Sequence, residues 1–231
     1  LFIILGVSIL VGILSLPVWQ IREVVVEGQT LFPPSILKEI ANLPLGENIF
    51  FINLTPAQKR LQSLIELKEV ILSKRLPGTI AIRVKERKPL AVALVEGRSQ
   101  VIDQEGVVLN PEEGGFYTIP QITQLPVIRG LKGTSIKNRR LDKELASAIG
   151  LSLSLLSKFI EPQRLQLELK RWDDISLLID DILRIRLGEP EALKEKIEVF
   201  KALLPEIQEN LSRVEYVDVR FVNRPVIKFR E

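Results

Sequence analysis

The stretch RLPGTIAIRVKERKPLA, residues 75–91, decides the fold. After the turn signal Pro77-Gly78, apolar and polar residues alternate one by one. This period of two predicts a strand over residues 79–86 with one buried face. The strand ends in a cluster of charges just before Pro89, and a second apolar stretch begins immediately after it.

No Gly/Ser-rich linker separates the two apolar stretches, so we interpret their junction as a stiff hinge between two domains. The alternative is a hairpin inside one larger domain. The predicted fold class is α+β. It comprises a transmembrane helix over residues 1–19, a β-α-α-β-β domain over residues 20–87, and a mixed β domain over residues 88–231 with two or more helices packed on its sheet.

Composition excludes several classes of function. The 231 residues carry 32 Lys and Arg against 29 acids, a net charge of +3, without a basic stripe that would favour nucleic acid. The absence of Cys excludes a disulfide frame and a thiolate metal site, and the absence of His removes the commonest general base and zinc ligand. We therefore expect no cofactor, no metal and no nucleic-acid partner. Because Met is also absent, we expect the sequence to be a fragment.

The N-terminal stretch, residues 1–19, contains no charge, and its polar residues are only Ser8 and Ser15. Nineteen helical residues nearly cross a hydrocarbon core of ~30 Å, so we predict a single membrane anchor. Trp19 stands where an interfacial aromatic residue belongs, and Pro17 ends or kinks the helix near that boundary. The alternatives are a cleaved signal peptide and a buried core helix. Orientation does not follow, because the cytoplasmic flank is expected to lie outside the sequence.

The first domain is predicted to have the order β-α-α-β-β, with three strands covered on one face by two helices. Thr55 is expected to cap the second helix, with Pro56 in its first position. The predicted strands cover residues 21–27, 69–73 and 79–86, and the helices begin near residues 34 and 55.

The second domain is predicted to be richer in strands, several of them with clean alternation. Asp103 and Gly106 suit a tight turn. The only acids there are Asp103 and Glu105, which lack the regular ligand spacing of a calcium loop. Helices are expected over residues 141–159 and from about residue 188 to about residue 204. Strands are expected over residues 90–95, 100–102, 107–109, 125–128, 165–169, 175–179, 183–187, 215–222 and 226–230.

Two acidic pairs, Asp173-Asp174 and Asp180-Asp181, invite comparison with the paired carboxylates of glycosidases. Both pairs fall where turns between strands are required, so we interpret them as solvated corners. We find no phosphate-binding glycine loop. Ser-Lys pairs remain open, but none lies on a glycine elbow. The sequence therefore predicts a protein that is not an enzyme, with no catalytic residue and no small-molecule substrate.

Several short motifs occur in a fixed order and together resemble the FtsQ/DivIB family of bacterial cell-division proteins, whose first extracytoplasmic domain is a POTRA domain. The resemblance extends from the anchor to the final strand. The motifs are Val24-x-Val26-x-Gly28, Gly46-x-Asn48-Ile49, the Pro77-Gly78 string through Ala91, Val101-Ile102-Asp103-x-x-Gly106-Val107-Val108, Leu125-Pro126-Val127-Ile128-x-Gly130 and Tyr216-Val217-Asp218-x-Arg220-Phe221.

The resemblance implies a bitopic scaffold of the divisome at the septum, anchored in the inner membrane with its bulk in the periplasm. It also implies partners of the FtsB/DivIC and FtsL type that bind the last strand of the β domain, while the POTRA domain and the anchor contribute to recruitment. Residue by residue, it assigns Arg220 to a partner carboxylate and makes Phe221 and Phe229 apolar anchors. Asn223 is the fourth candidate contact.

Alternatives stay open at this point. Both phenylalanines are also explained by core packing, and Arg220 and Phe221 are expected on opposite faces of one strand. Arg224-Pro225 stands where the family often has small residues, and Pro225 favours a sheet edge or bulge. A rival function is a POTRA-bearing periplasmic chaperone or transport component for outer-membrane or secreted proteins. A membrane-tethered hydrolase that uses the acidic pairs is a third.

Overall fold

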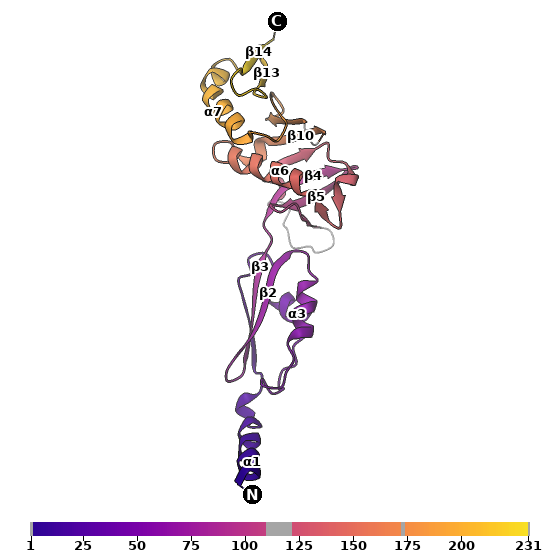
Figure 1. The fold of residues 1–231 in the computed structure, drawn as a ribbon, viewed down its shortest axis with the longest axis vertical. Helices are drawn as coiled ribbons and strands as arrows, with labels where there is room; N and C mark the ends of the chain where they lie inside the picture. The colour runs from indigo at the N-terminus through magenta and orange to yellow at the C-terminus, as the bar shows by residue number, and fades with distance from the viewer. Residues whose placement is uncertain (1, 110–121, 172–173, 231) are drawn as a thin grey trace. The chain divides into compact units, whose positions relative to one another are not determined.

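The structure, a computed structural model, describes residues 2–109, 122–171 and 174–230. It divides into two compact units, Leu1–Arg87 and Lys88–Glu231, which we describe separately (Figure 1). The α+β class predicted from the sequence is confirmed.

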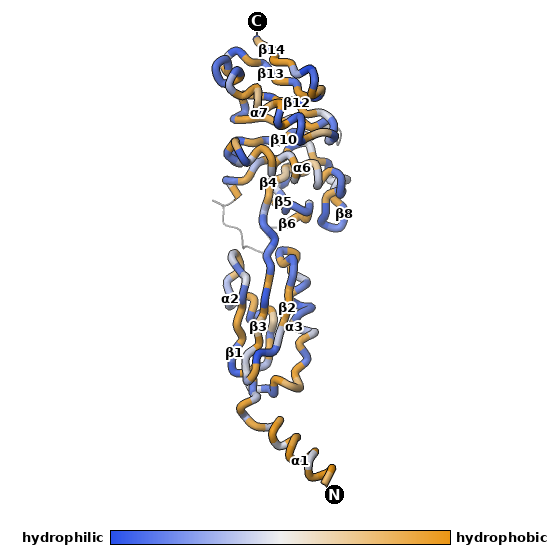
Figure 2. Tube along the Cα trace, turned by 60° about the vertical axis from the view of Figure 1, so that its left-hand side comes forward, coloured by the Kyte–Doolittle hydropathy of each residue, from blue (hydrophilic) through white to orange (hydrophobic). Residues whose placement is uncertain are grey.

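The first helix, α1 (Phe2–Leu14), has no buried residue and is orange over most of its length in Figure 2. It is shorter than the predicted helix over residues 1–19. Pro17 restricts the residue before it, and Leu16 is extended at φ −61°, ψ 144°, so the helix ends and a 3₁₀ turn, η1 (Pro17–Trp19), follows. Across residues 2–109, 122–171 and 174–230, the structure contains no helix with the length and apolar character needed to cross a membrane.

The first unit contains a three-stranded sheet in the order β1-β3-β2. The strands are β1 (Glu23–Glu27), β2 (Leu67–Arg75) and β3 (Thr79–Glu86), and the helices are α2 (Pro34–Ala41) and α3 (Thr55–Gln62). Strand β1 runs parallel to the central β3, and β2 runs antiparallel to it. The predicted element order is therefore confirmed.

The predicted cap of α3 is wrong. The helix begins at Thr55, and the Asn53 Oδ1 atom accepts a hydrogen bond from the Thr55 amide at 3.0 Å. The side chain that accepts a hydrogen bond at the start of this helix is therefore that of Asn53 and not that of Thr55. Further along the helix, the Gln58 Nε2 atom donates to the Val70 carbonyl at 3.2 Å.

The end of β3 is held by Glu86, a nearly buried carboxylate. Its Oε2 atom accepts from the Thr30 amide at 2.9 Å, the Thr30 hydroxyl at 2.6 Å and the Leu31 amide at 2.8 Å. Its Oε1 atom accepts from the Phe32 amide at 2.9 Å. Arg87 follows and donates from its amide to the carbonyl of residue 66 and from Nε to the carbonyl of residue 65. The charged residues of the hinge motif therefore close the first unit.

The second unit contains a nine-stranded sheet in the order β14-β13-β12-β11-β10-β7-β4-β5-β6. Helices α6 (Lys143–Leu156) and α7 (Leu193–Glu209) pack against each other, and their buried residues join those of the sheet in one core (Figure 1). The strands are β4 (Pro89–Val95), β5 (Arg98–Asp103), β6 (Val108–Leu109), β7 (Val127–Arg129), β10 (Leu165–Arg171), β11 (Asp174–Ile179), β12 (Leu183–Gly188), β13 (Val214–Asp218) and β14 (Val226–Phe229).

Both helices of the second unit differ from the predicted bounds. Asp142 caps α6, accepting from the Glu144 amide at 3.0 Å, so the helix begins later than residue 141. Helix α7 begins only at Leu193, because Ala192 adopts a left-handed conformation at φ 54°. It continues through Pro205, and Ile207 beyond the proline is buried in the core. A short hairpin, β8 (Ile136–Lys137) and β9 (Arg140–Leu141), was not predicted.

The expected turns are confirmed at residues 103–106 and 180–181, whereas Asp174 is the first residue of β11 and not part of a turn. The Asp103 Oδ1 atom accepts from the amides of Glu105 at 2.9 Å and Val107 at 2.8 Å. Asp180 and Asp181 both have positive φ, at 53° and 57°, in the connection between β11 and β12. Asp173 lies outside the described residues.

Candidate functional site

Strand β14 forms one edge of the nine-stranded sheet. It pairs antiparallel with β13, with Asp218 opposite Val226 and Val217 opposite Ile227. Pro225 precedes the strand and so removes no amide from within it. Within the described residues, no strand pairs with the other side of β14, and an open edge of this kind is a template for a strand of another chain.

The strand predicted over residues 215–222 is shorter in the structure. Strand β13 ends at Asp218, and the Asp218 Oδ1 atom then accepts from the Arg220 amide at 3.1 Å, which turns the chain. Arg220, Phe221 and Asn223 therefore lie in the connection between β13 and β14. The expectation that Arg220 and Phe221 occupy opposite faces of one strand is wrong.

Arg220 has a partner within its own chain. Its Nε atom lies 2.9 Å from Asp218 Oδ1, and its Nη2 atom lies 2.6 Å from Asp218 Oδ2. Burial alone favours the neutral form of Asp218, but the hydrogen bonds and charge of Arg220 outweigh it and lower the pKa of this carboxyl. The same pair raises the pKa of Arg220. A partner carboxylate would thus have to share or displace Asp218.

Arg220 and Phe221 line a hollow together with Asp174, Gly188, Glu189 and Lys196. Lys196 comes from α7, is only 5% exposed and donates from Nζ to the Glu189 carbonyl at 2.8 Å. Burial lowers the pKa of Lys196, while the charges of Glu191 and Glu189 act in the opposite direction. Lys196 was not among the residues predicted from the sequence. The available signal was its position on the apolar side of α7, three residues after Leu193.

The two phenylalanines have different environments. Phe221 is 69% exposed, so core packing does not explain it. Phe229 is half-buried against the core, and the Arg213 guanidinium carbon lies 5.9 Å from its ring centroid. Val226, at the start of β14, is 51% exposed. Exposed apolar side chains therefore flank the open backbone edge, and Asn223 is exposed beside them.

Strands β10 and β12 carry charged side chains on the sheet face opposite the core. Arg184 Nη2 lies 3.1 Å from Glu168 Oε2, and the Arg186 guanidinium lies 3.9 Å from the ring centroid of Tyr216. These groups are engaged within the chain. The site therefore presents the open main-chain edge of β14 and the exposed Phe221 ring, and Lys228 on β14 adds an exposed charge.

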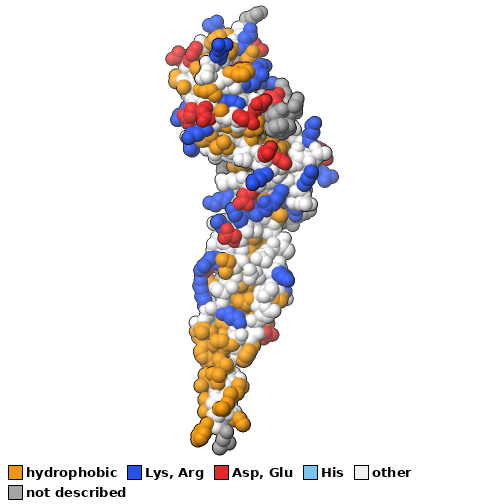
Figure 3. Space-filling view, viewed as in Figure 1, with side chains coloured by type: hydrophobic (Ala, Val, Ile, Leu, Met, Phe, Trp, Pro, Cys, Tyr) orange, Lys and Arg blue, Asp and Glu red, His pale blue; other side chains and the backbone are white. Residues whose placement is uncertain are grey.

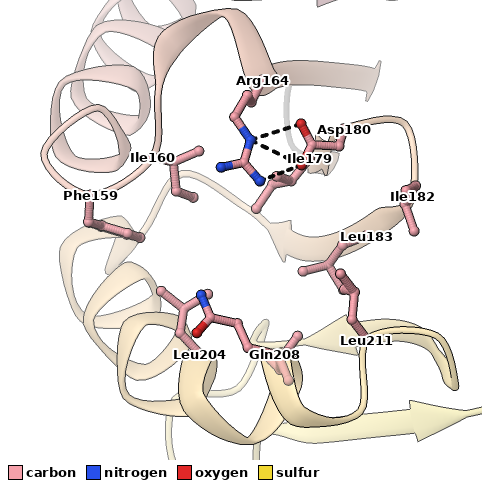
Figure 4. A pocket seen from close by; sticks show the side chains of 11 residues that line it. Phe159, Ile160, Arg164, Ile179, Asp180, Ile182, Leu183, Leu204, Gln208 and Leu211 are labelled. Carbon is pink, nitrogen blue, oxygen red and sulfur yellow. Dashed lines mark hydrogen bonds and ion pairs between the residues drawn. The ribbon is translucent and has the colours of Figure 1, made fainter.

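A second hollow lies where the β11–β12 turn faces the end of α7 (Figure 4). The Arg164–Asp180 pair forms one rim, with Arg164 Nη2 2.5 Å from Asp180 Oδ2, and Leu204 and Leu211 lie across from it. Its volume of about 110 Å³ is below the roughly 300–1,000 Å³ of small-molecule sites. Within the described ranges, no group of three or more His, Cys, Asp or Glu residues is placed to hold a metal ion.

Comparisons with known proteins match nearly the whole chain. The family described as "POTRA domain, FtsQ-type" matches residues 19–87, and the family described as "Cell division protein FtsQ/DivIB, C-terminal" matches residues 91–220. The cell division protein DivIB of Clostridium botulinum (strain Hall) is 25% identical over 235 residues, which cover 98% of this chain and 88% of that protein.

Two proteins named cell division protein FtsQ are also similar. That of Streptomyces bingchenggensis is 26% identical over 192 residues, which cover 80% of this chain and 68% of that protein. That of Rickettsia bellii is 37% identical over 154 residues, which cover 58% of this chain and 57% of that protein.

Proposed function

Because this chain belongs to the FtsQ/DivIB family of cell division proteins, we propose that it is a non-enzymatic scaffold of the bacterial divisome that links early and late division proteins at the septum. The observation that carries this proposal is the match of the C-terminal family over residues 91–220, which is preceded directly by the FtsQ-type POTRA match. The same C-terminal match argues against the rival function, a POTRA-bearing transport component.

The proposal includes attachment to the inner membrane through the N-terminal apolar segment, with the remainder of the chain in the periplasm. Support comes from α1, which carries no charge, contains Ser8 as its one polar side chain and has no buried residue. Exposed apolar surface of this extent requires either lipid or a partner.

The proposal places the partner contact at the open edge of β14. A segment of an FtsB/DivIC-type or FtsL-type protein adds as a further strand, with main-chain hydrogen bonds supplying affinity and Phe221 supplying an apolar anchor. Phe229 keeps β14 seated on the core, and Arg220, which remains bonded to Asp218, shapes the hollow beside Phe221.

The test is binding of the full chain, held in lipid nanodiscs, to periplasmic segments of candidate division partners. Phe221→Ala is expected to weaken binding about tenfold or more without changing the thermal unfolding temperature, because an exposed hot-spot side chain costs binding energy and little stability. Leu151→Ala, an exposed apolar residue on α6, is the matched control and should bind like the wild type. Equal binding by both variants would remove Phe221 from the contact, and no binding by the wild type would remove the partner claim.

A further inference from the structure

One end of the first unit carries exposed apolar side chains next to α1. We call four of these exposed side chains, together with the half-buried ring of Trp19, the α1-proximal patch; the four are Leu45, Phe50, Phe51 and Leu76. Phe51 is 72% exposed, Leu45 is 64% exposed and Leu76 is 57% exposed. In Figure 3 hydrophobic side chains continue from α1 onto the adjoining end of this unit.

The loop that carries most of the patch is bonded directly to the end of α1. The Asn48 Nδ2 atom donates to the Leu14 carbonyl at 2.6 Å, and the Ile49 amide donates to the Trp19 carbonyl at 2.8 Å. Trp19 donates from Nε1 to the Ile13 carbonyl at 2.8 Å, and its ring meets Phe50 edge-on at 5.1 Å between centroids. The patch is thus fixed to the last turn of α1.

A small core orients the loop. Ile49 and Ile52 are buried with Ile21 and Ile80, whereas Phe50 and Phe51, which lie between the two isoleucines, point outward. The Asn48 Oδ1 atom accepts from the Phe50 amide at 2.9 Å and fixes this turn. In this loop the two isoleucines therefore fill the small core. Both aromatic rings remain on the surface, where they can contact an apolar environment outside the protein.

We propose that the α1-proximal patch enters the lipid bilayer at the boundary between headgroups and acyl chains, so that the first unit itself rests on the membrane. This inference builds on the proposed attachment through α1. Helix α1 carries no charge and has no buried residue, and whatever surrounds it must also meet a loop bonded to its last turn. Aromatic side chains at this level are typical of the membrane interface.

The charged residues near the patch indicate which kind of lipid surface it would contact. Arg22 and Lys74 are balanced by Glu23 and Glu47, and Lys74 donates from Nζ to the Phe50 carbonyl at 3.0 Å. Contact through this end therefore depends on apolar insertion rather than on attraction to anionic lipid. Neutral phosphatidylcholine is a sufficient probe.

The experiment uses the absence of native Cys, which lets one introduced Cys carry an environment-sensitive fluorophore. The full chain is placed in phosphatidylcholine nanodiscs with and without brominated acyl chains. Labels go on Phe51→Cys and Leu45→Cys in the patch and on Ser63→Cys at the other end of the unit. A label on Gly12→Cys reports on α1, where nothing lies within 4 Å of an added Cβ.

We expect brominated lipid to at least halve the fluorescence at positions 51, 45 and 12 and to leave position 63 unchanged. Phe51→Ser should reduce the quenching at position 45. Ile71→Ser is the control, because Ile71 is also an exposed apolar residue but lies on β2, and this variant should leave the quenching at position 45 unchanged. Quenching at position 12 alone would overturn the inference and leave the attachment through α1 intact. An absence of quenching at position 12 would overturn both the proposed attachment through α1 and the inference about the patch. Quenching at position 63 would show that the opposite end of the unit also meets lipid, and would overturn the inference that the unit rests on the membrane through the patch.

Discussion

At the scale of single residues, Glu86 shows how one carboxylate joins distant parts of the first unit. Its four accepted hydrogen bonds connect the end of β3 to residues 30–32, more than fifty positions earlier in the chain. The sequence analysis noted Glu86 only as part of a charged cluster and a family motif. Its role was not readable, because it depends on where a loop far away in the sequence folds back.

Replacing Glu86 by Gln should destabilise the first unit by about 2 kcal/mol, because an amide NH₂ would face backbone N–H donors and leave buried groups unpaired. Hydrogen exchange of the Leu31 and Phe32 amides is the measurement, and both should lose protection. Glu69→Gln is the control, since Glu69 forms only an exposed pair with Lys85 at 3.6 Å and should cost less than about 0.5 kcal/mol. Equal costs for the two variants would contradict the role of Glu86.

Asp218 gives a prediction for pH. Its pKa in the folded chain lies below the ordinary value of 3.8, so its stabilising effect is fully present above pH 3.8 and is lost as the pH falls through the folded pKa. Asp218→Asn should cost about 1 kcal/mol at pH 7, allowing for the exposure of Arg220. Unfolding of both proteins by urea, measured between pH 7 and pH 2.5, should show this difference shrinking only below about pH 4. A difference independent of pH would contradict the assignment.

At the scale of elements, Gly188 joins the end of β12 to the hollow beside Phe221. Its φ is +66°, and an added Cβ would lie 2.9 Å from the Arg220 Cγ atom. Only glycine adopts this conformation routinely, and Arg220 packs over the space that it leaves. The candidate site therefore depends on a residue that makes no polar contact of its own there.

Gly188→Ala should cost more stability than Gly97→Ala, which has a similar φ of +80° and nothing within 4 Å of an added Cβ. Backbone strain alone predicts about 1–2 kcal/mol for each variant, and displacement of Arg220 adds to the cost at position 188. Thermal unfolding of both variants, alone and combined with Arg220→Ala, measures the difference. If Arg220→Ala does not reduce the cost at position 188, the packing argument fails.

The local sequence pattern predicted an element well where several signals agreed. The strand over residues 79–86 has the predicted bounds because alternation, a preceding turn and a following proline all agree. The end of β13 was misplaced because the Asp218 side chain accepts a hydrogen bond from the Arg220 amide and turns the backbone. The start of α7 was misplaced because Ala192 adopts a left-handed conformation. Neither signal is part of a hydrophobic period.

At the scale of the whole molecule, the α+β class and the element order of the first unit followed from the sequence, whereas the strand order of the large sheet did not. Strand β7 lies between β4 and β10 and is parallel to both. Such pairings depend on contacts between segments far apart in the chain. The open edge at β14 was suggested by Pro225, but the hollow containing Lys196 emerged only when α7 was placed beside β12.

The parallel pairing of β1 with β3 has a mechanical consequence. Strand β1 is the first strand of this unit and β3 is its last, so a pull on the start of β1 and on the end of β3 draws the paired strands along each other in opposite directions. The hydrogen bonds from Glu23–Thr79 to Glu27–Arg83 then share the load in shear and do not open one after another. If the chain is pulled at both ends in the proposed scaffold role, this is the loading direction that a small sheet resists best.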